Sequence, residues 1–343
     1  MEQLDSRKQA VLRAVVDEYV RSAEPVGSEH RALREGLGVS PATIRAEMAA
    51  LEDGGLLTHP HTSAGRTPTD RGYRVYVNML LRAGPLPAAE RQAIRRRIDH
   101  APAEPVGAAD EAIRILALVT QYTSVVAAPG LQQQTFRSLH LVPLGGERVL
   151  AIVATHSGGF QGHMIELPDG IEPDDLELLS RAITERLQGC RVSDLTRDRL
   201  EQVAGEASLR QRLAEAVGVW LRRNVGKAGR PQIRVEGARH LLREPEFRDP
   251  DAATQLLGVL EEQSVLAEVI ASAPDEGVWV SIGTENRREE LRGCSLVMAA
   301  YRVGDRPAGT VGIVGPTRMR YRHAVAAVQY VADRLTETLR AFG

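Results

Sequence analysis

The chain has 343 residues, a formal net charge of −2 and 43% hydrophobic residues. This composition excludes a largely disordered chain, and the length suits two or three folded domains. The two cysteines, Cys190 and Cys294, are too few for a disulfide framework or a structural zinc site. The sequence has no run of about 18 apolar residues, and its charged amphipathic start does not resemble a signal peptide. We therefore expect a cytoplasmic protein with no membrane partner.

Helix signals dominate the first 55 residues. Apolar residues recur at the spacing of one helix face over residues 12–20, and Ser6 is the candidate cap of that helix. A short second helix is expected over residues 28–35. The serine–proline pair at 40–41 then predicts the start of a third helix, whose inward-facing stripe consists of Ile44, Met48 and Leu51.

Residues 56–83 predict a short ribbon followed by a helix. LLTHP has strand character, HTSAG is a turn and RTPT returns as a second strand, before the helical segment DRGYRVYVNMLLRA. Three helices followed by a two-stranded ribbon make a winged helix, a variant of the helix-turn-helix motif, to which we assign residues 1–84. The same arrangement also occurs in protein-interaction modules, which is the alternative for this unit.

Candidate DNA contacts gather on the third helix and on the ribbon. The second helix of a helix-turn-helix enters the major groove with its first turns facing the bases. Arg45 can donate two hydrogen bonds to guanine, Thr43 offers a hydroxyl or a methyl group, and Ser40 can bind phosphate. Residues 55–82 hold four arginines and only one acidic residue, which favours a backbone contact there. The predicted DNA-binding residues are Ser40, Thr43, Arg45, Ala46, His59, His61, Arg66, Arg71 and Arg74.

We find no constellation for catalysis, a cofactor or a metal, so no enzyme is expected. The pair His59 and His61 lacks a nearby third ligand, which favours a solvated ribbon tip over a metal site. GGFQG and GTVGIVG match no phosphate loop, and the second is better explained by close packing within a strand. Cys294 lies in an apolar strand with no histidine or carboxylate spaced to activate it. Thr317-Arg318 suits either an anion site at a helix start or, as we favour, helix capping with a contact between domains.

The rest of the chain predicts a linker and two further units, giving an α+β multidomain protein. Residues 85–107 carry proline clusters around RQAIRRR and are predicted to be a linker with one basic helix. Residues 108–130 and 229–343 alternate strands and helices and are assigned to one split α/β unit. Between them, residues 131–228 hold three strands separated by Gly-Gly pairs, then several helices. This pattern predicts a β-meander-plus-helices domain inserted into the split unit.

Three separated motifs resemble those of one known family. SPATIRAEMAALEDGGLLTHPHTSAGRTPTDRGYRVYV (residues 40–77), IGTEN (282–286) and GPTRMRY (315–321) occur in the order typical of the heat-inducible transcription repressor HrcA family. The resemblance covers essentially the full length. It implies a homodimeric repressor of heat-shock chaperone operons that binds double-stranded, inverted-repeat (CIRCE-type) operator DNA, with its activity maintained by the chaperonin. It also implies that the split unit is a GAF-like domain and that the insert is the dimerisation domain.

Two positions depart from the family pattern. Ala46 stands where the family usually has Asn, and alanine cannot read adenine through two hydrogen bonds. Arg320 stands where the family usually has an acidic residue, so a salt bridge carried over to this position has the wrong sign.

The alternative function is a GAF-type small-molecule sensor with a winged-helix output domain. A sensor needs a roomy pocket with convergent polar groups. The strands of the split unit are rich in Val, Ile, Ala and Gly, which favours a scaffold.

The insert is expected to carry the dimer interface, because an inverted-repeat operator requires twofold symmetry. Its helices hold more apolar residues than one small meander can cover, namely Leu176, Leu179, Ile183, Leu187, Leu209, Leu213, Val217 and Trp220.

Overall fold

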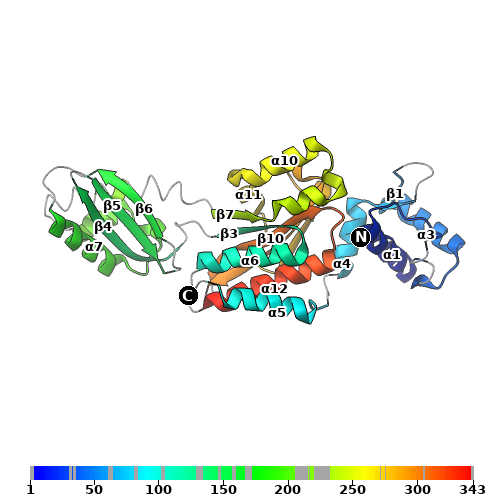
Figure 1. Cartoon of the computed structure of the whole chain (residues 1–343), viewed down its shortest axis with the longest axis horizontal. Helices are drawn as coiled ribbons and strands as arrows, with labels where there is room; N and C mark the ends of the chain where they lie inside the picture. The colour runs from blue at the N-terminus through cyan, green and yellow to red at the C-terminus, as the bar shows by residue number, and fades with distance from the viewer. Residues whose placement is uncertain are drawn as a thin grey trace.

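The computed structural model describes residues 4–30, 33, 36–60, 65–80, 84–101, 105–128, 134–145, 148–156, 160–166, 172–204, 215, 217–219, 232–270, 272–274, 276–303 and 306–340. These ranges form three lobes in a row (Figure 1). We call them the N-terminal lobe (residues 4–80), the central lobe (84–128 and 232–340) and the meander lobe (134–219). The predicted α+β class is confirmed. Among the described helices, none is both long and apolar enough to cross a membrane.

The N-terminal lobe packs its helices against a two-stranded sheet. Its elements are α1 (Ser6–Ser22), α3 (Pro41–Asp53), β1 (Leu57–Thr58), β2 (Thr67–Pro68) and α4 (Asp70–Leu80). The strands pair antiparallel, as the ribbon prediction requires. The cap of α1 is Asp5 and not Ser6, because the Asp5 carboxylate accepts the backbone N–H of Lys8 at 2.8 Å. Half of the residues of the predicted helix over 28–35 lie outside the described residues.

The central lobe is built on an antiparallel five-stranded sheet in the order β7-β3-β10-β9-β8. Its strands are β3 (Thr123–Ala128), β7 (Gln232–Glu236), β8 (Val278–Ile282), β9 (Cys294–Val303) and β10 (Arg306–Pro316). One face carries α5 (Ala88–Asp99), α6 (Pro105–Thr120) and α12 (Tyr321–Leu339), and the other α10 (Pro250–Glu261) and α11 (Gln263–Ile270). Short 3-10 turns connect these elements: η3 (Ala238–Arg243), η4 (Pro245–Phe247), η5 (Gly283–Glu285) and η6 (Glu289–Leu291).

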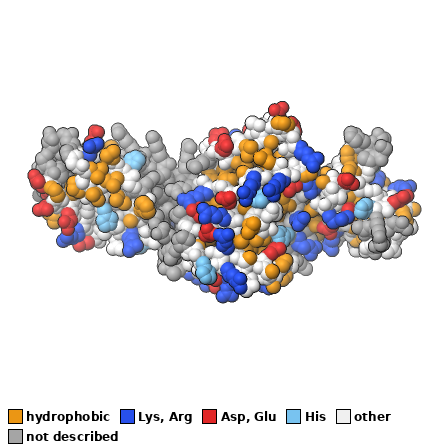
Figure 2. Space-filling view, in the orientation of Figure 1, with side chains coloured by type: hydrophobic (Ala, Val, Ile, Leu, Met, Phe, Trp, Pro, Cys, Tyr) orange, Lys and Arg blue, Asp and Glu red, His pale blue; other side chains and the backbone are white. Residues whose placement is uncertain are grey.

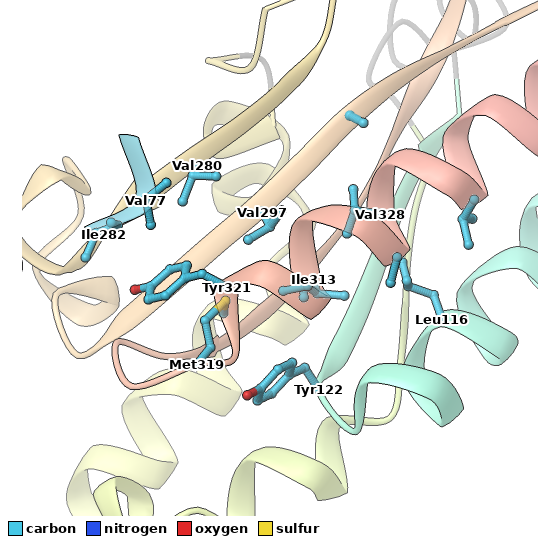
Figure 3. Close-up of a cluster of buried hydrophobic side chains, with 14 of the residues drawn as sticks. Val77, Leu116, Tyr122, Val280, Ile282, Val297, Ile313, Met319, Tyr321 and Val328 are labelled. Atoms are coloured by element: carbon cyan, nitrogen blue, oxygen red, sulfur yellow. The ribbon is translucent and has the colours of Figure 1, made fainter. Parts of the chain in front are cut away.

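The core on the α12 side of this sheet is continuous with the core of the N-terminal lobe. Neighbouring strand residues point to opposite faces, so Val297 joins the α12 side whereas Leu296 and Met298 join the α10 side. Figure 3 shows Val77 of α4 beside Ile282 at the end of β8. The helix that ends the N-terminal lobe therefore packs into the central core.

The segment predicted as a linker contributes to that core. Ile94 and Ile98 of α5 are fully buried and belong to the same cluster as α6 and α12. The Arg97 guanidinium donates to Glu111 of α6 at 2.8 Å. The basic helix is therefore present as predicted, but it is a packed helix of the central lobe because two isoleucines one turn apart give it an apolar stripe.

The meander lobe leaves and re-enters the central sheet between two strands that pair with each other, β3 and β7. It contains β4 (Phe136–Gly145), β5 (Arg148–Thr155) and β6 (Phe160–Glu166) in that order, then α7 (Pro173–Leu187), η2 (Val192–Asp194) and α8 (Arg197–Ala204). One face of the sheet covers the apolar stripe of α7, which is buried at Leu176, Leu179, Ile183 and Leu187. The meander therefore covers these four side chains, contrary to the prediction. Leu209, Leu213 and Trp220 lie outside the described residues, and Val217 is buried.

Glycines in β10 allow the central strands to approach closely, as predicted from their spacing. A Cβ on Gly312 would lie 2.5 Å from the carbonyl oxygen of Val297, and one on Gly309 would overlap the carbonyl of Ala127. We expect Gly312→Ala to lower the free energy of unfolding by about 1–3 kcal/mol, because overpacking forces the backbone to shift. Urea denaturation measures this change.

The matched control is Gly258→Ala in α10, where a Cβ would meet nothing within 4 Å. That substitution should be neutral or raise stability by about 0.5–1 kcal/mol, because alanine is the better helix former. Equal effects at the two glycines would contradict the packing argument.

Candidate nucleic-acid interface

The start of α3 is capped as its sequence predicts. The hydroxyl of Ser40 accepts the backbone N–H of Thr43 at 3.2 Å and lies 2.9 Å from the Thr43 hydroxyl. Pro41 occupies the first helical position, where its missing N–H costs no hydrogen bond. Ser40 is thus a cap first, and a phosphate contact would share the same hydroxyl. The buried face of the helix consists of Ile44, Met48 and Leu51, as predicted.

The opposite face of α3 is turned to solvent. Arg45 and Ala46 are exposed and Thr43 is half-buried. The Arg45 side chain is 65% exposed, and its Nη2 lies 3.8 Å from the carboxylate of Glu29, which is itself exposed. A long ion pair between exposed groups contributes little. The Arg45 guanidinium is therefore available for the bidentate contact to guanine that the sequence suggests.

Glu52, near the end of α3, holds the ribbon in place. Arg66 donates from Nε to Glu52 at 2.9 Å, and His59 Nε2 lies 3.3 Å from the same carboxylate. The Arg66 backbone also exchanges two hydrogen bonds of 2.9 Å with Val26. Since Arg66 is only 14% exposed, its charge is used inside the lobe. The other predicted histidine, His61, lies outside the described residues.

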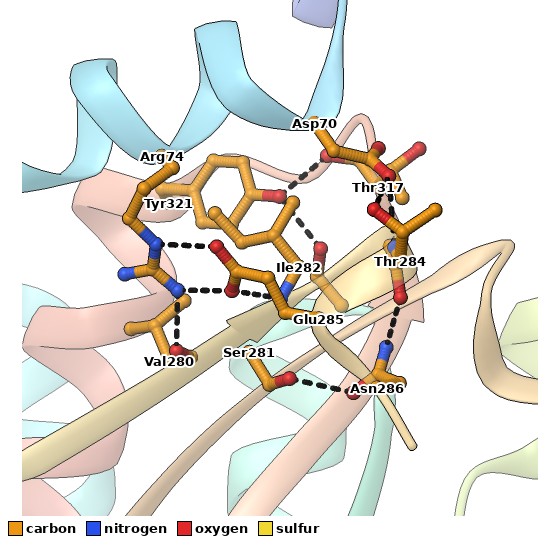
Figure 4. A network of polar contacts seen from close by, with 12 residues as sticks. Asp70, Arg74, Val280, Ser281, Ile282, Thr284, Glu285, Asn286, Thr317 and Tyr321 are labelled. Atoms are coloured by element: carbon orange, nitrogen blue, oxygen red, sulfur yellow. Dashed lines mark hydrogen bonds and ion pairs between the residues drawn. The ribbon is translucent and has the colours of Figure 1, made fainter. Parts of the chain in front are cut away.

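Two arginines one turn apart on α4 differ in their surroundings. Arg71 is exposed and forms no hydrogen bond or ion pair with the residues that the structure describes. Arg74 donates to both carboxylate oxygens of Glu285, at 2.7 Å through Nε, and to the carbonyl of Val280 at 2.6 Å (Figure 4). The hydrogen bonds that Arg74 donates to the Glu285 carboxylate raise the pKa of Arg74. Arg71 is thus available to a phosphate, whereas Arg74 is committed to the central lobe.

Asp70, the first residue of α4, binds the turn that follows β8 (Figure 4). Its carboxylate accepts the backbone N–H of Thr284 at 2.8 Å and the Thr284 hydroxyl at 2.9 Å. The neighbouring Gly283 has φ +52°, and a Cβ there would overlap the Asp70 carboxylate. Asn286 fixes the far side of the turn, because its Oδ1 accepts the hydroxyl of Ser281 at 2.7 Å and its Nδ2 donates to the carbonyl of Gly283 at 3.0 Å.

Tyr321 connects the start of α12 to α4. Its buried hydroxyl donates to the Thr317 carbonyl at 2.6 Å, so the Ser295 hydroxyl, also at 2.6 Å, is the donor to the tyrosine oxygen. Burial raises the pKa of Tyr321 well above its usual range. The ring centroid lies 5.7 Å from that of Tyr73 in α4. The tyrosine therefore stays neutral and acts as a packing residue of this contact.

Arg318 makes the contact between lobes that we favoured over an anion site. It donates to Glu246 at 2.8 Å, to Glu244 at 2.7 Å and to the carbonyl of Val20 in α1 at 2.9 Å. The side chain is 11% exposed. Two carboxylates neutralise the guanidinium, so no charge is left there for an anion.

The three motifs that are far apart in the sequence thus meet at one place, which we call the lobe junction: DRGYR on α4, IGTEN after β8 and GPTRMRY before α12. The motif residues were visible in the sequence, but their pairing was not. The roles of Asp70, Thr284 and Glu285 were not predicted from the sequence, and Arg74 was predicted to contact DNA. The sequence of a helix does not show whether the partner of its arginine is a phosphate or a carboxylate from elsewhere in the chain.

Cys294 is buried, and burial raises its pKa to about 12, which leaves it an unreactive thiol at neutral pH. Across the described ranges, no group of three or more His, Cys, Asp or Glu side chains is placed to hold a metal ion.

The chain is similar to known proteins over almost its whole length. The family model for the HrcA protein C-terminal domain matches residues 108–325. The heat-inducible transcription repressor HrcA of Symbiobacterium thermophilum is 38% identical over 99% of this chain and 100% of its own length. That of Halalkalibacterium halodurans is 37% identical over 98% of each chain. A crystal structure of a hypothetical protein at 2.2 Å resolution shares the fold, with TM-score 0.66 and 23% identity over 99% of this chain and 100% of the other.

The fold and the comparisons together define a regulator of transcription and not an enzyme. The chain belongs to the HrcA family of heat-inducible transcription repressors.

We expect Arg318→Ala to lower the free energy of unfolding by roughly 1–3 kcal/mol, because it removes charged hydrogen bonds and leaves Glu244 and Glu246 facing each other. The control is Arg292→Ala, whose side chain is 51% exposed and pairs with the exposed Glu289. That change should cost less than about 0.5 kcal/mol. Urea denaturation compares the two, and an equal loss would contradict the role given to Arg318.

Proposed function

We propose that this chain represses transcription of heat-shock chaperone operons by binding an inverted-repeat, CIRCE-type operator as a homodimer. The observation that carries the proposal is the outward face of α3, with Thr43, Arg45 and Ala46 at the start of a capped helix. In this proposal the N-terminal lobe is a winged helix-turn-helix, the central lobe is a GAF-like domain and the meander lobe is an inserted dimerisation domain. A protein that binds an operator must be in the same compartment as the chromosome. We therefore also propose a cytoplasmic location.

In this proposal, one set of residues contacts the DNA bases and another set contacts the DNA backbone. Arg45 would read guanine from the major groove, with Thr43 and the Ala46 methyl beside it. Arg71 would contact a phosphate, with Ser40 and the ribbon residue His59 as neighbouring polar groups. The predicted contacts of Arg66 and Arg74 are withdrawn, because both guanidinium groups are already paired within the protein.

The test compares three arginine variants on an operator duplex and a scrambled duplex over a range of salt concentrations. Arg45→Ala should cost roughly 1–3 kcal/mol of operator affinity and narrow the gap between the two duplexes. Arg71→Ala should weaken both alike and lower the magnitude of the log K against log salt slope by about two for a dimer, since each subunit loses one phosphate contact.

Arg74→Ala is the matched control, because it removes the same charge from the same helix. Its salt slope should equal that of the wild type. Full discrimination by Arg45→Ala, or a reduced slope for Arg74→Ala comparable to that of Arg71→Ala, would contradict the assignment.

The dimer surface that we propose is the open face of the meander sheet. Strand register puts Val142, Leu150 and Met164 side by side across the three strands, on the face opposite α7. Phe160 at one edge is 77% exposed. Figure 2 shows hydrophobic side chains gathered over this lobe. An open apolar sheet face of this kind marks an interaction site, and it lies at the other end of the molecule from α3 (Figure 1).

Met164→Glu is expected to convert the dimer to a monomer and to weaken operator binding. Each dimer loses two buried methionine side chains, about 3 kcal/mol or more in total, which raises the dimer dissociation constant by more than about a hundredfold. Leu242→Glu is the control, since Leu242 is an equally large exposed apolar side chain on the central lobe. Sedimentation measures both variants, and a Met164→Glu protein that remains dimeric at the wild-type affinity would refute this interface.

We propose further that the chaperonin raises the fraction of repressor able to bind DNA. The support is topological: the central sheet closes only when β7 pairs with β3 after the whole meander lobe has intervened, and such chains expose apolar surface while folding. Chaperonin with its nucleotide should increase operator occupancy at a fixed repressor concentration after thermal inactivation. Unchanged occupancy would count against the mechanism.

The central sheet supports the alternative function, a small-molecule sensor, less well than it supports a scaffold. Both faces of the central sheet are filled by apolar side chains, such as Val297 and Ile313 under α12 and Leu296 and Met298 under α10. This filling favours a scaffold over a domain that encloses a ligand beside its sheet.

A further inference from the structure

A cleft of about 550 Å³ lies between the N-terminal and central lobes, where α1, α4 and α12 come together (Figure 1). One wall comes from α1 and α4, and the other from residues 84–87 and the start of α12. Its volume is in the range of clefts that hold small organic ligands. The cleft is separate from the outward face of α3, and it adjoins the lobe junction through Arg320, which belongs to the GPTRMRY motif.

The charge of this cleft is unbalanced. Asp17 accepts the hydroxyl of Tyr76, and His323 pairs with Glu90 at 2.7 Å. Arg21, on the α1 side, is bound to Glu18.

Arg320 and Arg322 line the same cleft and are exposed. Neither forms an ion pair or side-chain hydrogen bond with any residue in the described part of the chain. Two guanidinium groups thus line the cleft without an ion-pair partner in the described part of the chain, and Asp17 is the one carboxylate among the lining residues.

The remaining lining is apolar and comes from both lobes. Val20 of α1 and Ala326 of α12 face the cleft, together with Pro85 and Pro87 of the segment between the lobes. Arginine is suited to phosphate because its planar fork donates two parallel hydrogen bonds. Apolar walls suit the body of a ligand that carries such a phosphate.

We propose that this cleft binds a small organic phosphate, with its phosphate groups on Arg320 and Arg322 and its apolar body against Val20, Pro85 and Ala326. The inference goes beyond operator binding and does not depend on it. A duplex backbone is the other polyanion that two free arginines could meet, but a concave site with apolar walls fits a compact ligand better than a DNA surface. Because both lobes supply walls, a bound ligand would stabilise their docked arrangement.

The experiment is calorimetric titration of the full-length chain with ATP, pyrophosphate and adenosine, without magnesium and at one chloride concentration. We expect ATP to bind most tightly, with a dissociation constant below about 1 mM, and adenosine to bind far more weakly. The double variant Arg320→Gln/Arg322→Gln should weaken ATP binding by at least about tenfold. The control Arg181→Gln/Arg292→Gln removes two exposed arginines from outside the cleft and should bind ATP as the wild type does.

Thermal unfolding of each variant checks that the fold is retained, which the exposure of all four arginines predicts. No ATP binding at millimolar concentration, or equal binding by the two double variants, would overturn the proposal. A second arm measures affinity for duplex DNA against salt. A lower salt slope for Arg320→Gln/Arg322→Gln would assign the arginines to the DNA backbone and would also overturn it.

Discussion

The pairing of α4 with the turn after β8 is the constraint on which the arrangement of the lobes depends. Asp70 and Arg74, one helical turn apart, each bind a residue of that turn, so two opposite charges fix the helix at two points. On its other side α4 approaches the residue before β1 so closely that a Cβ on Gly72 would overlap the Leu56 carbonyl. The helix therefore belongs to two lobes at once, and its apolar face joins their cores without a break.

This constraint also decides which positive charges are available for function. The net charge is close to zero, and Arg66, Arg74 and Arg318 are consumed by carboxylates within the protein. Arg45 and Arg71 on the N-terminal lobe, and Arg320 and Arg322 in the cleft, are exposed and lie at separate places. Anion recognition is therefore a local property of this molecule. A steering field from the whole surface is not required.

The sequence predicted the elements well because their signals are local. The cap at Ser40, the stripe of α3 and the strands of the central sheet depend on spacing within one segment. Prediction from the sequence failed where the partner of a residue lies far away in the chain. The linker prediction missed that Ile94 finds a core in α6 and α12, and the arginines of α4 could not be separated without knowing that Glu285 lies against one of them. The open apolar face of the meander sheet could not be predicted from the sequence, because neighbouring residues of a strand point to opposite faces. Only the pairing of the strands shows which face α7 covers.

The measurement that tests this account most directly is the distance distribution between spin labels on α3 and α5. Labels at Ala50→Cys and Arg96→Cys, both exposed positions, would be introduced in a Cys190→Ser background, with unlabelled protein added to suppress contacts between subunits. The account predicts one narrow distribution for the wild type and a broad one when Asp70→Asn and Arg74→Ala are combined. A broad distribution in the wild type, or no change in the double variant, would contradict the claim that this junction fixes the N-terminal lobe.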